Sequence, residues 1–273
     1  MPTVKRSGIS ISYDAIGTGQ CVVLTHSFLC DRTMFRYQVD ALKSQYRVIN
    51  IDLRGHGESG DSLSPYSLYD LVEDVIEVLD AESVQQAAWA GLSIGGFLSM
   101  RAALRHPERV GALVLMDTDA GPESTFKRLK YAALRTGVSL LGPKPIVPSL
   151  LPIFLGSTSL RERKSLCAEF RQKFLDMRVK SIIPGIGAIM SRDDVRSQLS
   201  QIQCPTLVIV GQEDNPLPPP KSQAIADRIR GSNLVVIPKS GHLSAVETPE
   251  EVGAALMAFL RKNYLQGNGL RVA

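Results

Sequence analysis

The chain has 273 residues and a mass of 29.7 kDa; 44% of its residues are apolar and 21% are charged. The apolar fraction excludes an intrinsically disordered chain, and the length suits one large domain or two modest ones with a sizeable core. The net charge of +4 gives no case for a nucleic-acid partner, and no apolar run approaches the roughly 18 residues of a membrane span.

Strands and helices alternate along most of the chain. Residues 5–19 are typical of two short strands before a glycine-rich break. Near-continuous apolar runs predict buried strands at 21–27, 46–53, 87–93, 110–118, 205–214 and 233–242. Helical spacing predicts helices at 32–44, 68–81, 94–105 and 249–262. Buried strands alternating with helices indicate a parallel sheet covered by helices on both faces.

Residues 121–200 break this alternation. They contain no convincing strand, only helical segments at 123–137, 160–178 and 194–200 among prolines and glycines. Such an insertion is expected to form a lid over the carboxyl ends of the strands, where ligands bind in open α/β sheets. The expected organisation is a core of residues 1–120 and 201–266, a helical cap of residues 121–200 and a flexible tail of residues 267–273.

The expected cap is basic. Residues 121–200 hold 14 lysines and arginines against 6 aspartates and glutamates, a net charge of +8, whereas the remainder holds 17 against 21, a net charge of −4. A solvated basic face of amphipathic helices would explain this excess. Attraction of an acidic substrate or an anionic surface is the alternative.

The cysteines and the N-terminus bear on the compartment. Four cysteines in this length do not make a disulfide scaffold, and none has the CxxC spacing of a zinc or thioredoxin-like site. The first ten residues carry charges with no apolar stretch behind them, unlike a signal peptide. We expect a cytoplasmic protein without stable membrane insertion, either a monomer or a homodimer.

The strongest functional signal is the pentapeptide Gly91-Leu92-Ser93-Ile94-Gly95, between an expected strand and an expected helix. GxSxG in this context is typical of a nucleophile elbow, where a strained turn lifts the serine hydroxyl off the sheet. The glycines leave room for strand and helix to pack closely, and the positive end of the helix favours developing negative charge. Ser93 is the predicted nucleophile; an ordinary capping serine is the alternative.

A serine nucleophile needs a base, and His242 is the predicted one. It follows the last expected strand, at the same sheet edge as Ser93 if the sheet is parallel. The other histidines have structural explanations: His106 precedes a proline at a helix end, His56 lies in a turn-rich loop, and His26 closes the first buried strand.

The base needs a carboxylate that fixes its tautomer, and Asp214 is the predicted one. It follows a buried strand and completes the chain order serine, aspartate, histidine that is typical of this arrangement. The rivals are Glu213 beside it, and Asp117 or Asp119 after the preceding strand. Glu213 and Asp214 cannot both serve, because neighbours on an extended strand point to opposite sides.

The oxyanion that forms during acyl transfer needs donors. The predicted donors are the backbone N–H groups of Ile94 and Phe28, and the Phe28 ring is expected to line the acyl pocket or to pack in the core. Apolar stretches of the cap at 146–155 and 181–190 are expected to complete that pocket or only to pack the cap onto the core. The candidate substrate-binding residues are His26, Ser27, Leu29, Leu151, Phe154 and Ile183.

Five motifs in this order resemble the α/β-hydrolase superfamily over nearly the full length. They are the His26-Ser27 loop, Asp52-x-Arg54-Gly55-x-Gly57-x-Ser59, Gly91-x-Ser93-x-Gly95-Gly96, Gly211-x-x-Asp214 and Gly241-His242. The resemblance implies a mostly parallel eight-stranded sheet flanked by helices, with a helical cap between strands 6 and 7. The family usually has His-Gly where this chain has His26-Ser27, so the backbone there is less permissive. Ser27, Met34 and Arg192-Asp193-Asp194 ahead of Cys204-Pro205-Thr206 are similar to the 3-oxoadipate enol-lactonase branch.

The resemblance implies hydrolysis of a small-molecule ester or lactone through an acyl-enzyme, with no metal and no cofactor. The chain lacks the P-loop pattern, and serine stands at position 93 where halide-displacing relatives carry aspartate. A carboxylesterase acting on small or medium hydrophobic esters is the first expectation. The alternatives are an enol-lactonase acting on an anionic substrate, a carbon–carbon bond hydrolase, a perhydrolase, a lipase and a non-catalytic ligand-binding homologue.

Overall fold

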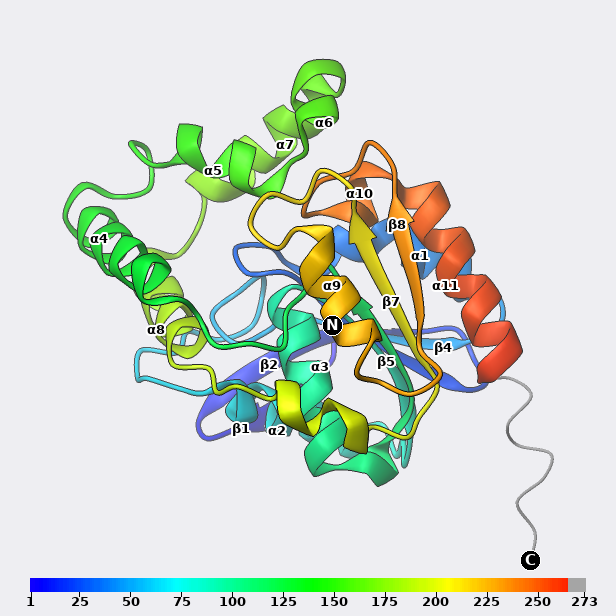
Figure 1. The fold of residues 1–273 in the computed structure, drawn as a ribbon. Coiled ribbons are helices and arrows are strands. Elements are labelled where there is room, and N and C mark those ends of the chain that lie inside the picture. Colours follow the sequence, from blue (N-terminus) through cyan, green and yellow to red (C-terminus); the bar gives the residue numbers. More distant parts are fainter. Residues whose placement is uncertain (265–273) are drawn as a thin grey trace, which may run out of the picture.

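The computed structural model describes residues 1–264, so the predicted tail at 267–273 lies outside the described residues. An eight-stranded sheet runs through the molecule (Figure 1). Its strands are β1 (Thr3–Arg6), β2 (Ile9–Ile16), β3 (Cys21–Thr25), β4 (Arg47–Ile51), β5 (Ala87–Leu92), β6 (Val110–Met116), β7 (Thr206–Gly211) and β8 (Asn233–Ile237). The order across the sheet is β1-β2-β4-β3-β5-β6-β7-β8. Strands β1 and β2 pair antiparallel, as do β2 and β4, and every other neighbouring pair is parallel.

Burial explains the composition of the strands. Every residue of β3, β5 and β7 is buried, because these strands have helices on both faces. Strand β8 lies at the sheet edge and is buried only at Ile237. The expected strands at 205–214 and 233–242 end earlier, at Gly211 and Ile237, and the residues beyond them form the loops of Asp214 and His242.

Helices cover both faces of the sheet. They are α1 (Arg36–Leu42), α2 (Leu68–Ala81), α3 (Ile94–Arg105), α9 (Pro219–Ala226), α10 (Ser244–Glu247) and α11 (Pro249–Asn263), with 3-10 turns η1 (Arg32–Phe35) and η2 (Pro107–Arg109). Helices α1 and α11 lie on one face, and α2, α3 and α9 lie on the other (Figure 1). A capping box starts α2: Ser67 accepts from the Asp70 N–H, and the Asp70 carboxylate accepts from the Ser67 N–H.

The segment between β6 and β7 forms further helices, which we call the cap. They are α4 (Thr125–Leu141), α5 (Val147–Phe154), α6 (Ser157–Glu162), α7 (Lys164–Leu175) and α8 (Val179–Met190), followed by the 3-10 turn η3 (Arg196–Gln201). The single helix expected at 160–178 is wrong: the chain breaks between α6 and α7 at Arg163, which has φ −112° and ψ 65°. The expected helix at 194–200 is the 3-10 turn.

Within the cap, α4 packs against α8, and both α5 and α6 pack against α7. Figure 1 shows the cap at the end of the sheet toward which β7 points. The cap therefore lies over the loops that follow the parallel strands. No helix among residues 1–264 is both long enough and apolar enough to cross a membrane.

Candidate active site

Ser93 lies in a strained turn between β5 and α3. Its φ is 57° and its ψ is −112°, outside the usual regions for a residue with a side chain. Two glycines make the turn possible: a Cβ on Gly91 would lie 2.1 Å from the Gly95 oxygen, and a Cβ on Gly95 would lie 2.0 Å from the Thr25 oxygen. The turn places the Ser93 hydroxyl at the N-terminus of α3, as expected for a nucleophile elbow.

Three buried side chains from separate loops form one hydrogen-bonded chain. Ser93 Oγ lies 3.0 Å from His242 Nε2, and His242 Nδ1 lies 2.9 Å from Asp214 Oδ2. An ionised carboxylate only accepts hydrogen bonds, so Nδ1 carries the proton and Nε2 is the acceptor for the serine hydroxyl. This arrangement can remove a proton from Ser93.

The rival carboxylates have other partners. Glu213 accepts from the Ser157 hydroxyl at 2.9 Å and from the Thr158 N–H at 2.8 Å, both at the start of α6. Asp117 accepts from the Gly211 N–H at 2.8 Å and from the Ser244 hydroxyl. Asp119 forms an ion pair with Lys221. Among these carboxylates, the hydrogen bond to His242 belongs to Asp214.

The electrostatic environment favours the protonated form of His242. Burial acts most strongly on its pKa and lowers it, but the charge and hydrogen bond of Asp214, with the charges of Asp117 and Glu247, raise the pKa above its ordinary value. Burial and the nearby charge of Asp214 raise the pKa of Asp117 well above its usual range. The site therefore stabilises the imidazolium that proton transfer from Ser93 would create.

Glu247 ties the loop of His242 to the cap. Its Oε1 accepts from the N–H groups on either side of His242, Gly241 at 3.0 Å and Leu243 at 3.1 Å. Its Oε2 accepts from the Gly156 N–H of the cap at 2.8 Å. The backbones approach so closely that a Cβ on Gly241 would lie 2.1 Å from the Gly156 nitrogen. Sequence reasoning missed Glu247, because its spacing from His242 does not show where the side chain turns.

The predicted oxyanion donors lie at the same end of the sheet. Ile94 is the first residue of α3, so its N–H has no intrahelical acceptor. Phe28 lies on the loop after β3, which buried His26 fastens: His26 Nε2 accepts from the Leu53 N–H at 3.0 Å, and Nδ1 donates to the Ser27 oxygen at 2.7 Å. Burial lowers the pKa of His26 to about 4, so the ring stays neutral and holds this loop rather than exchanging protons.

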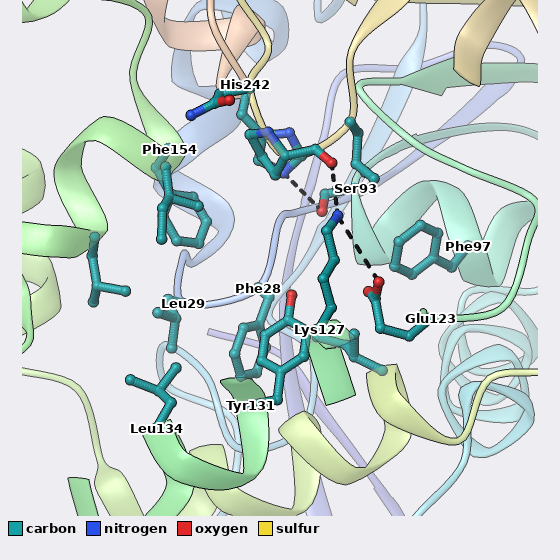
Figure 2. A pocket seen from close by; sticks show the side chains of 16 residues that line it. Phe28, Leu29, Ser93, Phe97, Glu123, Lys127, Tyr131, Leu134, Phe154 and His242 are labelled. Carbon is teal, nitrogen blue, oxygen red and sulfur yellow. Dashed lines mark hydrogen bonds and ion pairs between the residues drawn. The ribbon is translucent and has the colours of Figure 1, made fainter. Parts of the chain in front are cut away.

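Ser93 and His242 open onto a cavity of about 360 Å³ between the sheet and the cap (Figure 2). Most of its wall is apolar. Among the described lining residues, the charged side chains are Glu123 and Lys127. The described residues that line it are Phe28, Leu29, Ser93, Phe97, Glu123, Lys127, Tyr131, Leu134, Leu150, Ile153, Phe154, Ile189, Asn215, Pro216, Leu217 and His242. Among residues 1–264, no three His, Cys, Asp or Glu side chains are grouped so as to hold a metal ion.

Comparison with known proteins places this chain in a family. The model of the alpha/beta hydrolase fold matches residues 20–249. The chain belongs to the α/β-hydrolase family. This confirms the predicted fold and establishes the protein as a member of a hydrolase superfamily.

Several relatives of this α/β hydrolase are esterases or lactonases. A thermophilic esterase from Thermogutta terrifontis is 32% identical, with a TM-score of 0.90 over 95% of this chain and 96% of that one. An enol-lactonase from Burkholderia xenovorans is 26% identical, with a TM-score of 0.89 over 95% and 100%. The 3-oxoadipate enol-lactonase 1 of Acinetobacter baylyi is 27% identical over 94% of this chain and 95% of its own length.

The structure brings part of the predicted substrate-binding set to the cavity. Phe28, Leu29 and Phe154 line it, whereas His26, Ser27, Leu151 and Ile183 do not. His26 and Ser27 are fully buried within the loop after β3, and Leu151 and Ile183 are half-buried on α5 and α8. Helices α5 and α8, which were expected to supply the pocket, line this cavity through Leu150, Ile153 and Ile189 as well as Phe154.

Sequence reasoning missed the contribution of α4. Lys127, Tyr131 and Leu134 all line the cavity, and Glu123 lies just before the helix. Their spacing of four and three residues puts these three side chains on one face of the helix. That spacing was available in the sequence, but the direction in which the face points depends on how the cap packs.

Proposed function

We propose that this α/β hydrolase is a carboxylesterase that cleaves small or medium hydrophobic esters through an acyl-enzyme on Ser93. The observation that carries the proposal is the hydrogen-bonded chain from Ser93 through His242 to Asp214, opening onto an apolar cavity. The likeness to an esterase at 32% identity over 95% of the chain supports the same activity.

The geometry supports a two-step acyl transfer. As Ser93 Oγ attacks the ester carbonyl, His242 Nε2 takes the hydroxyl proton, and Asp214 stabilises the imidazolium. The N–H groups of Phe28 and Ile94 donate to the oxyanion. The tetrahedral intermediate expels the alcohol, which receives the proton from His242. Water then attacks the acyl-enzyme with His242 again as base, and the carboxylic acid leaves with Ser93 restored.

The cavity limits the size of the acyl group. A volume of about 360 Å³ with a largely apolar wall favours short and medium chains. Turnover of p-nitrophenyl esters from acetate to palmitate should therefore peak among the shorter members. A peak at palmitate would contradict the expected pocket size.

The test pairs this series with Ser93→Ala and with labelling by a fluorophosphonate, which reacts with activated serines. Wild type should turn over the esters and be labelled, and the variant should do neither. Wild type that binds a small ligand but is never labelled would indicate a non-catalytic homologue and would overturn the proposal.

Lactone hydrolysis is the second candidate. It uses the same attack on a carbonyl, but the leaving oxygen stays tethered to the acyl group, so water releases a single product that carries both the former alcohol and the carboxylic acid. Two observations favour it: the likeness to enol-lactonases, and the cationic side chain of Lys127 in the cavity wall. Faster turnover of anionic lactones than of p-nitrophenyl esters would make it the main activity.

A further inference from the structure

We propose that Lys127 is a specificity-determining residue that selects substrates carrying a carboxylate a few carbons from the scissile ester. The inference rests on the proposed function and narrows its substrate class. It predicts that half-esters of short dicarboxylic acids, and esters with a carboxylate on the alcohol side, are better substrates than uncharged esters of the same shape.

Among the described side chains, Glu123, Lys127 and Arg192 form a charged group beside the cavity with one positive charge in excess. Glu123 Oε2 lies 2.8 Å from Arg192 Nη1, and the Arg192 side chain is 1% exposed, so these two form a buried pair. Lys127 Nζ lies 3.9 Å from Glu123 Oε1, beyond hydrogen-bond distance. The three side chains therefore sum to +1, and Lys127 is the cation of the three that lines the cavity.

Lys127 also keeps hydrogen-bonding capacity. Its ammonium group has three donors, and the hydrogen bond to the Pro216 oxygen at 3.0 Å uses one of them. The side chain is 37% exposed, so a ligand can reach it. Figure 2 shows the side chain extending from α4 into the cavity that Ser93 and His242 also line.

The charge and the apolar side chains around Lys127 favour a carboxylate over a more highly charged anion. One excess charge matches a singly charged group, whereas a phosphate ester would bring more charge than the wall neutralises. The side chains that flank Lys127 in the wall include Phe97, Tyr131 and Leu134, which suit a methylene chain between the two ends of the substrate. The cavity of about 360 Å³ keeps that chain short.

The experiment compares kcat/KM for anionic esters and uncharged isosteres. Monoethyl glutarate is paired with ethyl 5-methylhexanoate, and 4-acetoxybutanoate with 4-methylpentyl acetate, all followed by proton release. In each pair an isopropyl group replaces the carboxylate, so the ratio of anionic to uncharged kcat/KM isolates the charge. The two pairs place the carboxylate on the acyl side and on the alcohol side.

Lys127→Met should lower this ratio by about tenfold or more in at least one pair, since a partly exposed charge-assisted hydrogen bond is lost. Lys127→Arg keeps the charge and should restore most of the ratio. Arg128→Met removes the neighbouring exposed cation of α4 and should leave the ratio unchanged. A Lys127 that only ties α4 to the loop of Pro216 would lower both members of a pair equally, and an unchanged ratio in both pairs would overturn the inference.

A second readout separates this inference from the proposed function. Glutarate should slow fluorophosphonate labelling of wild type more than that of Lys127→Met. If neither ester class is turned over but this difference persists, the esterase proposal fails and the carboxylate site stands. If uncharged esters are turned over and glutarate protects both proteins equally, the esterase proposal stands and the carboxylate site fails.

Discussion

Replacing Asp214 by asparagine tests the proposed site most sharply, because the neighbouring contacts fix how the amide must lie. The Leu217 N–H donates to Asp214 Oδ1 at 2.9 Å, so the asparagine oxygen remains there. The NH₂ group then occupies the Oδ2 position, 2.9 Å from His242 Nδ1. It donates to Nδ1, the ring proton moves to Nε2, and the histidine loses its acceptor for the Ser93 proton.

The magnitude follows from two losses in a buried site. An imidazolium beside a neutral amide loses about 3–5 kcal/mol of stabilisation, by comparison with other broken buried ion pairs. In the productive tautomer His242 carries its proton on Nδ1, which then faces the NH₂ group of the asparagine. Two donors oppose each other, and this costs about 1–2 kcal/mol more. The two losses sum to about 4–7 kcal/mol, and about 1.4 kcal/mol corresponds to a tenfold change in rate, so kcat should fall by about three to five orders of magnitude.

The assay is steady-state hydrolysis of p-nitrophenyl butyrate, with thermal unfolding to show that the variant folds. Asp117→Asn is the matched control: its amide can accept from the Gly211 N–H and donate to the Ser244 hydroxyl, so kcat should stay within about tenfold of wild type. Retained activity in Asp214→Asn, or a thousandfold loss in Asp117→Asn, would refute the assignment of the acid.

Three further results are expected. The pKa of His242 is raised and the base acts when neutral, so kcat/KM should fall as the pH drops through a midpoint above about 6.5; a midpoint below that value contradicts the environment described. Ser93→Ala should abolish turnover and labelling while the melting temperature stays within a few degrees, because it removes one small hydroxyl; residual turnover equal to wild type would exclude Ser93 as nucleophile. Glu247→Gln turns an NH₂ group toward a backbone N–H and should lower the free energy of unfolding by about 1–3 kcal/mol in urea titration, together with kcat; an unchanged protein would show that the contact with Gly156 is dispensable.

The elements that the sequence predicted best are those whose own residues determine them. The bounds expected for the helices at 68–81 and 94–105 are those observed for α2 and α3, since a capping box starts one and the elbow starts the other. The strands expected at 205–214 and 233–242 are longer than β7 and β8. Residues 212–214 and 238–242 follow the two apolar runs directly, but they turn out of the sheet. The chain order of Ser93, Asp214 and His242 gave the candidate site, because parallel strands bring their carboxyl ends to one edge.

The cap was less predictable for a physical reason. Tertiary packing holds its helices over the carboxyl ends of the strands. The spacing of apolar residues in the sequence shows which side chains share a helix face, but not where that face points. Leu151 was expected in the pocket and Leu150 lines it, a difference of one helical step of about 100°. In the sequence, Lys127 is one of many cations in a basic segment. Its position in the cavity wall depends on how α4 packs against α8, which the sequence pattern does not show.

Two glutamates that are close in sequence to the residues proposed for catalysis join the cap to the site. Glu213, next to Asp214, holds the start of α6, and Glu247, in the helix after His242, holds Gly156 just before it. A shift of this part of the cap would therefore move the loop of Asp214 and the loop of His242 together. Substitutions at these contacts should lower kcat for every ester, whereas substitutions on the cavity face of α4 should change the preference among esters. The two groups of variants thus distinguish the effect of the cap on kcat from its effect on substrate preference.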